Sequence, residues 1–136
     1  MLSKNYLAIY AKSFNWAGFF LPKKTYKKCS MLYDFCRVVD NIADDENKVK
    51  FKKDNFIKFR NNFVNKNYDD PIIKNMWDLM NEFNISRKIV DDLLEGINSD
   101  IKEVVKLNSK KEILIYSYRV AGTVGLMMAK IMNVSK

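Results

Sequence analysis

Apolar residues recur every three or four positions along nearly the whole chain, and no other feature limits its fold as strongly. This spacing is typical of amphipathic helices, and no stretch shows the strict alternation of a half-buried strand. Only four glycines and two prolines occur in 136 residues, which disfavours a sandwich or barrel built on frequent tight turns. A chain of this length suits one domain or a part of a larger one. We therefore predict an all-α protein.

Proline, serine and aspartate residues mark where the expected helices begin and end. Pro22 suits a first helical turn, and Asp69-Asp70-Pro71 is a break. Ser86 and Ser109 are placed to cap helices, the latter in a capping-box sequence. The expected helices cover residues 3–20, 22–44, 47–66 and 71–83, a segment that follows Ser86, and a last segment that begins at the capping box 109–112. The residues expected to face the core from the middle helices are Phe56, Phe59, Phe63, Ile73, Met76, Trp77, Met80, Phe83, Ile89, Leu93 and Ile97.

The composition excludes several kinds of catalytic chemistry. The chain has no histidine, which removes Ser-His and Cys-His nucleophile pairs, the commonest general base and nearly every zinc or di-iron site. Its two cysteines, Cys29 and Cys36, are too few for a disulfide framework or a four-ligand zinc site. We therefore expect a cytoplasmic protein with reduced thiols, whose chemistry uses carboxylates, phenols, cations and hard metal ions.

The chain is strongly basic, with 24 Lys and Arg residues against 16 Asp and Glu and a formal charge of +8. Such a balance favours an anionic partner, which can be a nucleic acid, a membrane surface or a phosphorylated substrate. A general compositional bias explains the charge equally well. Because the cations are scattered over most of the expected helices, we expect no nucleic acid partner. The uncharged runs, 13–22 and 120–129, have ten residues each, whereas a membrane-spanning helix needs about 20 apolar residues.

An acidic cluster in this basic chain indicates a site. On the expected helix 22–44, Tyr33, Arg37, Asp40 and Asp44 are spaced by four, three and four positions and so lie along one stripe. Two carboxylates at i,i+4 repel by about 0.2–0.5 kcal/mol on an exposed helix, and each acid near a helix C-terminus opposes the helix dipole by about 0.3–1 kcal/mol. Such a pair can hold Mg²⁺, which binds phosphate oxygens that Arg37 could also contact. The alternative is a solvated acidic helix end with Arg37 and Asp40 as a surface ion pair.

Small residues form a second unusual pattern, in the last expected helix. Ala121, Gly125 and Ala129 lie four positions apart with Gly122 beside them, and each glycine inside a helix costs about 1 kcal/mol relative to alanine. This small-residue ridge permits the close approach of another helix or of a slender apolar ligand. Helix packing is the commoner use, and the pattern alone leaves both open.

Three segments together resemble the squalene/phytoene synthase family. They are SFNWAGFFLP, MLYDFCRVVDNIAD and YSYRVAGTVGLMMAKIM, which follow one another in this order within residues 12–132. The segment LLEGINSD, residues 93–100, also resembles the part of the family between the last two blocks. The last block is most similar to bacterial phytoene synthases.

The resemblance implies an isoprenoid synthase fold, in which helices surround a central cavity. It also implies a prenyltransferase that joins two prenyl diphosphates head-to-head, through a cyclopropylcarbinyl diphosphate intermediate and with Mg²⁺ or Mn²⁺. Geranylgeranyl diphosphate is the expected substrate and phytoene, in carotenoid biosynthesis, the expected product. A squalene or dehydrosqualene synthase that acts on farnesyl diphosphate is the alternative within the family.

The same resemblance assigns a role to individual residues of this chain. Asp40 and Asp44 match the metal-binding carboxylates of the first aspartate-rich motif, and Arg37 and Tyr33 match residues of the same helix that contact substrate. The other matches are Lys12, Ser13 and Phe14 at the diphosphate, Tyr116 near the reacting carbons, and Val120 and Val124 in the cavity lining. The expected catalytic residues are Asp40, Asp44, Arg37 and Tyr116.

The chain departs from the family pattern at three points. Asn41 stands where many members have aspartate, Ala11 stands where serine is frequent, and no second aspartate-rich motif occurs. We therefore expect residues 1–136 to be the N-terminal part of one synthase domain whose C-terminal part is missing, with peripheral attachment to the inner face of the membrane compatible with the basic charge. Two alternatives lie outside the family: a basic helical nucleic-acid-binding module and a non-catalytic helical subunit.

Overall fold

The computed structural model describes residues 12, 15, 21–44, 48–99, 101 and 109–132, with Asp44 described in its backbone only. These residues form α-helices and one π-helical segment, and no strand occurs among them, so the all-α prediction is confirmed. The elements are α2 (Lys23–Asp44), α3 (Val49–Val64), α4 (Pro71–Phe83), α5 (Arg87–Asn98), α6 (Lys110–Ser117), η1 (Tyr118–Gly122) and α7 (Thr123–Met132). The expected helix at 3–20 lies outside the described residues, apart from Lys12 and Asn15, which are both helical.

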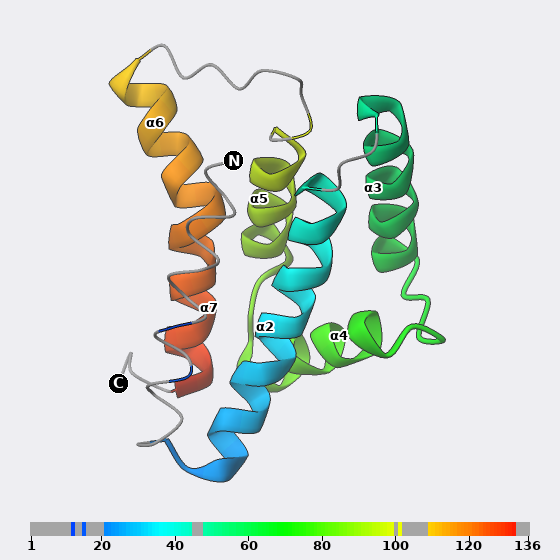
Figure 1. The fold of residues 1–136 in the computed structure, drawn as a ribbon. Coiled ribbons are helices and arrows are strands. Elements are labelled where there is room, and N and C mark those ends of the chain that lie inside the picture. The colour runs from blue at the N-terminus through cyan, green and yellow to red at the C-terminus, as the bar shows by residue number, and fades with distance from the viewer. Residues whose placement is uncertain are drawn as a thin grey trace.

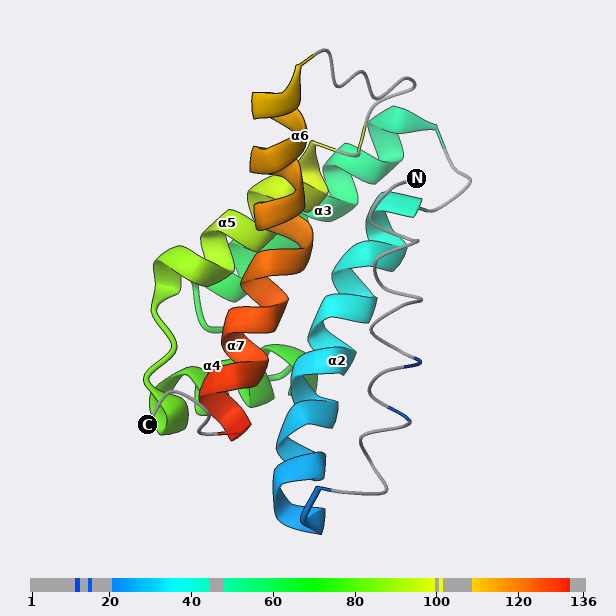
Figure 2. The ribbon, with the colours of Figure 1, turned by 90° about the vertical axis from the view of Figure 1, so that its left-hand side faces the viewer.

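The helices are arranged around α2, which rises through the middle of the molecule (Figure 1). Helix α3 descends along one side of α2, α4 crosses at the base, and α5 rises again beside α2. Elements α6, η1 and α7 form one continuous descending column, and α2 lies against it in the turned view (Figure 2). Accordingly α2 contacts α3, α4, α5 and α7. In the part of the chain that the structure describes, no helix is both long and apolar enough to cross a bilayer.

An aromatic cluster joins α2, α3 and α4. The ring of Phe35 lies 5.7 Å from that of Phe59 and 5.5 Å from that of Phe63, measured between centroids. Phe63 in turn stacks on Trp77 at 4.9 Å, and the Trp77 indole N–H donates a hydrogen bond of 2.9 Å to the backbone carbonyl of Phe63. The buried indole N–H thus has a hydrogen-bond acceptor, as buried tryptophans usually do. The cluster fixes the positions of α3 and α4 relative to α2.

Side chains cap three of the helices, two of them at Ser86 and Ser109 as expected from the sequence and the third at Asp70, in the expected break. The Asp70 carboxylate accepts from the N–H of Ile72, the Ser86 hydroxyl oxygen from that of Ile89, and the Ser109 hydroxyl oxygen from that of Glu112. Each cap satisfies one backbone donor that the first helical turn leaves without a partner. Most of the residues expected in the core are buried, with Phe83 and Ile89 only partly so.

The last expected helix is interrupted, which periodicity did not predict. At η1 the backbone N–H of Thr123 bonds to the carbonyl of Tyr118, five residues earlier, and the Thr123 hydroxyl donates to the carbonyl of Arg119 at 2.6 Å. Such π-helical segments inside α-helices occur frequently at functional sites. The extra residue changes which side chains of α6 and α7 share a face.

Helix α5 approaches this segment at Gly96. A Cβ atom added to Gly96 would lie 2.6 Å from the Cβ of Arg119 and 3.0 Å from Cγ1 of Val120. Real Cβ atoms do not come as near as 2.6 Å to a neighbour, so only glycine permits this contact. The glycine that allows close packing is therefore on α5, opposite the η1 part of the column.

We expect Gly96→Ala to destabilise the fold. Shifting the packed neighbours costs about 1–3 kcal/mol and the better helix propensity of alanine returns up to about 1 kcal/mol, so the free energy of unfolding should fall by about 1–2 kcal/mol. Urea unfolding followed by circular dichroism measures it. Gly122→Ala is the matched control, because its added Cβ would meet first the ring of Tyr118, at 3.2 Å, which is exposed and can move. Equal stability of Gly96→Ala and the unmodified chain would show that α5 does not depend on this approach.

Candidate functional site

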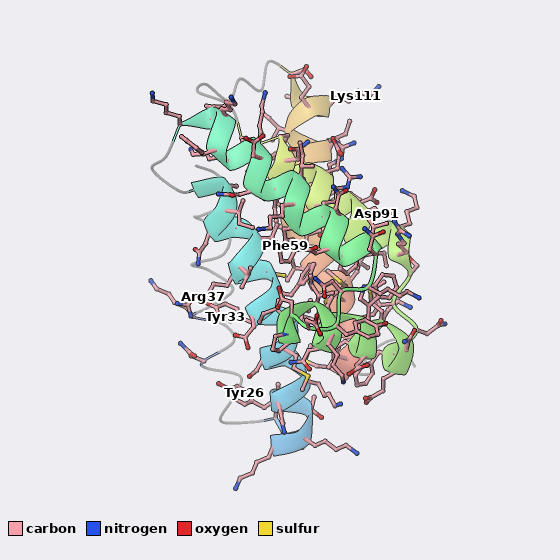
Figure 3. All side chains as sticks on the ribbon, turned by 90° about the vertical axis from the view of Figure 1, so that its right-hand side faces the viewer. Tyr26, Tyr33, Arg37, Phe59, Asp91 and Lys111 are labelled. Atoms are coloured by element: carbon pink, nitrogen blue, oxygen red, sulfur yellow. The ribbon has the colours of Figure 1, made fainter. Side chains whose placement is uncertain are left out.

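The acid stripe of α2 comprises Tyr33, Arg37, Asp40 and Asp44. Tyr33 and Arg37 extend to the same side of the helix, as the sequence spacing predicted (Figure 3). Arg37 is exposed, Tyr33 is half-buried, and Asp40 is only 5% exposed. Asp44 ends the helix one turn after Asp40, and its side chain lies outside the described residues. One helix therefore presents a phenol, a cation and a buried carboxylate, in that order, along one stripe.

The burial of Asp40 argues against a solvated acidic helix end. Asp40 and Thr123 are the buried polar side chains among the described residues. No ion pair joins Arg37 to Asp40 in the described part of the chain, although Asp40 does have an interaction partner. Burying a carboxylate costs free energy unless hydrogen bonds, a cation or a metal ion compensate for the lost water. Asp40 itself is therefore not a solvated surface acid.

Cys36, one turn before Asp40, is a feature of the site that the sequence did not single out. Burial, with repulsion from the Asp40 carboxylate as a second cause, raises the pKa of the Cys36 thiol from 9.0 to about 12. Cys36 and Cys29 are both free and buried, as expected for reduced thiols. The Cys36 thiol stays protonated at neutral pH, so it is a small apolar neighbour of Asp40 and not a nucleophile.

The expected apolar residues of the site lie on the α6–α7 column. Tyr116 on α6, Val120 on η1 and Val124 on α7 are all buried. The small-residue ridge beside them is only half-buried, and both of its suggested uses stay predictions. Because α7 packs against α2, the valine-bearing column and the acid stripe belong to neighbouring helices.

The remaining expected site residues belong to the N-terminal segment. Lys12 is helical and exposed, whereas Ser13 and Phe14 lie outside the described residues. Asn41, the departure noted beside the aspartates, is turned towards α3, where it lines a hollow with Phe59 and Lys58.

The donor set of the stripe fits a hard divalent cation. No group of three or more potential metal ligands occurs among the side chains that the structure describes, which do not include Asp44, Asp45 and Glu46. Asp40 and Asp44 nevertheless offer oxygen donors one helical turn apart, and Mg²⁺ is commonly held by one or two carboxylates together with substrate phosphates. With no histidine in the chain, oxygen donors suit Mg²⁺ or Mn²⁺ better than zinc.

Comparison with known proteins identifies the family of the chain. Residues 7–136 match the squalene/phytoene synthase family, so the chain belongs to that family and its helices to the all-α isoprenoid synthase fold. It is 29% identical over 140 residues to the 15-cis-phytoene synthase of Pantoea ananas, covering 94% of this chain and 45% of the relative. It is 27% identical over 127 residues to the 4,4'-diapophytoene synthase of Staphylococcus haemolyticus, covering 90% and 44%. With phytoene synthase 1 of Zea mays it shares 26% over 136 residues, covering 93% and 31%.

The chain thus spans less than half the length of these three relatives. No solved structure gives a significant match to it.

Because the folded-state pKa of Cys36 lies above its unfolded value, the thiol contributes stability that is complete below pH 9 and is lost as the pH rises towards 12. We expect the free energy of unfolding to fall in this window by up to about 1.4 kcal/mol per pH unit more in the unmodified chain than in Cys36→Ala. Urea unfolding of both proteins at several pH values (about 8–11) measures the difference in the free energy of unfolding. Lysines and tyrosines also titrate in this range, but both proteins contain them, so their contribution cancels in the difference. Parallel pH profiles would contradict the assignment.

Proposed function

We propose that the chain is the N-terminal part of a prenyltransferase that joins two prenyl diphosphates head-to-head, forming phytoene from geranylgeranyl diphosphate. The observation that carries this proposal is the family match over residues 7–136, together with a buried Asp40 on the acid stripe. The relatives named phytoene synthase support the same reaction. The reaction passes through a cyclopropylcarbinyl diphosphate and belongs to carotenoid biosynthesis.

In this proposal the acid stripe holds the diphosphate end of the substrate. Asp40 and Asp44 would hold Mg²⁺, or Mn²⁺ in its place, which supplies charge stabilisation to the departing diphosphate. Arg37 is exposed beside them and can donate hydrogen bonds to the same phosphate oxygens, with Tyr33 one turn earlier. Lys12, Ser13 and Phe14 would contact the diphosphate from the N-terminal segment.

The α6–α7 column would hold the carbon chain. Tyr116, Val120 and Val124 are buried, so they provide an apolar wall that keeps water from an allylic cation. The Tyr116 ring can stabilise such a cation through its face, and its hydroxyl can pass a proton to the departing diphosphate. Neither role needs histidine, which the chain lacks.

The length of the prenyl diphosphate substrate distinguishes a phytoene synthase from a squalene or dehydrosqualene synthase. The relative in Staphylococcus haemolyticus is named a 4,4'-diapophytoene synthase, which favours the alternative of a squalene or dehydrosqualene type of reaction on farnesyl diphosphate. More of the named relatives are phytoene synthases, and for this reason we propose geranylgeranyl diphosphate as the substrate.

We expect Asp40→Asn and Asp44→Asn to lower turnover strongly in a protein that carries residues 1–136 with the remainder of a synthase domain. Losing a carboxylate that holds the metal removes several kcal/mol of transition-state stabilisation, which is about 100-fold or more in rate. Product formation from labelled geranylgeranyl diphosphate, at limiting and at saturating Mg²⁺, measures the effect.

Asp54→Asn is the matched control, because Asp54 is an exposed acid on α3 that forms no ion pair with any described residue. Circular dichroism establishes that each variant is folded. Near-normal turnover of either stripe variant at limiting Mg²⁺ would rule out the metal-binding role.

We also expect residues 1–136 alone to be inactive and to associate. The relatives contain more than twice this length, and α6 exposes Ile113, Leu114 and Ile115, with Leu114 at 69%. Contiguous exposed apolar side chains of this kind promote association. Incubation with geranylgeranyl or farnesyl diphosphate and Mg²⁺ tests activity, and light scattering after gel filtration tests association. A phytoene or squalene-type product above a no-protein control would prove the prediction wrong.

A further inference from the structure

Half of the net positive charge of the protein lies on one helix. The sequence of α3 contains five cations (Lys50, Lys52, Lys53, Lys58 and Arg60) and one acid, which is four of the eight net positive charges in the chain. Its neighbours α4 and α5 each contain more acids than cations. Helix α2 has five cations and three acids, so α3 has the largest excess of positive charge among the helices that the structure describes.

The lysines of α3 form no ion pair with any residue that the structure describes. On other helices Lys28 pairs with Glu82, Lys74 with Asp78, Arg87 with Asp91 and Lys88 with Asp92. Counting described residues alone, Arg60 is the one cation of α3 that approaches an acid, Glu95, at 3.8 Å. Among the described residues Lys50, Lys53 and Lys58 form no ion pair, and all three are exposed. Their charge is available to an external anion.

Apolar side chains lie among these lysines on the surface. Phe51 is 56% exposed and Ile57 55%, and Val64 is exposed at the end of the same helix. The opposite face of α3 contributes Phe56, Phe59 and Phe63 to the core. The exposed Phe51, Ile57 and Val64 are therefore not part of the core. Helix α3 stands at the edge of the molecule, on the far side of α2 from the α6–α7 column (Figures 1 and 3). We call Lys50, Phe51, Lys53, Ile57, Lys58 and Val64 the basic face of α3.

A hollow adjoins each flank of this face. One, of about 420 Å³, lies between α2 and α3 and is lined by Asn41, Ile42, Asn55, Lys58, Phe59 and Asn62. The other, of about 250 Å³, is lined by Lys53, Phe56, Ile57, Arg60, Asn61 and Asn98. Each combines apolar carbon with a cation and amide donors. Such a lining suits a ligand that has both a phosphate group and a hydrocarbon chain.

We propose that the basic face of α3 docks on the surface of an anionic phospholipid bilayer. Lysines near such a surface are attracted to its headgroups, while Phe51 and Ile57 can enter the boundary between headgroups and acyl chains. A nucleic acid would be attracted by the same lysines but offers no partner for exposed aliphatic side chains on its backbone. The basic face is separate from the acid stripe, so docking and prenyl transfer can succeed or fail independently.

The test is sedimentation of the chain with vesicles of phosphatidylcholine alone and with vesicles that also contain phosphatidylglycerol. We expect binding only to the anionic vesicles, weakened by added salt. The variant Lys50→Glu/Lys53→Glu/Lys58→Glu should bind about 100-fold more weakly. The matched control Lys23→Glu/Lys24→Glu/Lys27→Glu makes the same change in net charge at exposed lysines of α2 and should retain most of the binding. Equal losses in the two variants would overturn the proposal.

A reporter on the basic face separates insertion from simple attraction. Phe51→Trp should show a blue-shifted emission with anionic vesicles, because the indole enters a less polar environment. Phe51→Ser/Ile57→Ser should bind several-fold more weakly although no charge has changed. An unshifted emission, or binding to a duplex oligonucleotide as tight as binding to anionic vesicles, would contradict docking on lipid.

Discussion

The packing of α2 against four other helices is the constraint on which the rest of the structure depends. A helix surrounded in this way must bury a broad apolar face, and Leu32, Phe35 and Val39 provide it with almost no exposure. The acid stripe occupies an adjacent face of α2, so Asp40 lies at the margin of the core. A carboxylate at this depth is held in place by the packing around it. In the proposed site, placement of this kind would give the carboxylate its geometry before any ion binds.

A second constraint operates where α5 meets the α6–α7 column. Gly96 lets the helices approach until a Cβ would collide with Arg119, and at the same level the column changes to π-helical geometry. The extra residue rotates α7 relative to α6, and Tyr116 lies before this change while Val124 lies after it. The arrangement of the proposed apolar wall thus depends on a local backbone feature and on one glycine in another helix.

The sequence predicted the helices well because the signals for them are local. Ser86 and Ser109 cap as expected, since a capping side chain bonds within its own turn, and Asp70 caps at the expected break. The π-helical segment at Tyr118 was missed because a single extra residue hardly disturbs a 3.6-residue period. For the candidate site, spacing placed Tyr33, Arg37 and Asp40 on one helix but could not show that Asp40 is buried, since burial is decided by elements distant in sequence. Ion pairs divide in the same way. The pairs Lys74–Asp78, Arg87–Asp91 and Lys88–Asp92 lie within one helix at i,i+4 spacing, whereas Lys28–Glu82 joins two helices that only the fold brings together.

Whether the acid stripe is one wall of a metal–diphosphate site is the central claim, and paramagnetic broadening by Mn²⁺ tests it most directly. In an NMR titration of the chain with Mn²⁺ and inorganic diphosphate, amide signals near Asp40 and Asp44 at the end of α2 should broaden first. An excess of Mg²⁺ should restore them, because both ions use the same oxygen donors. The acid pair Asp91 and Asp92 on α5 is an internal comparison, since its carboxylates are held by Arg87 and Lys88. Broadening centred on α5, with the signals of α2 unchanged, would contradict the account.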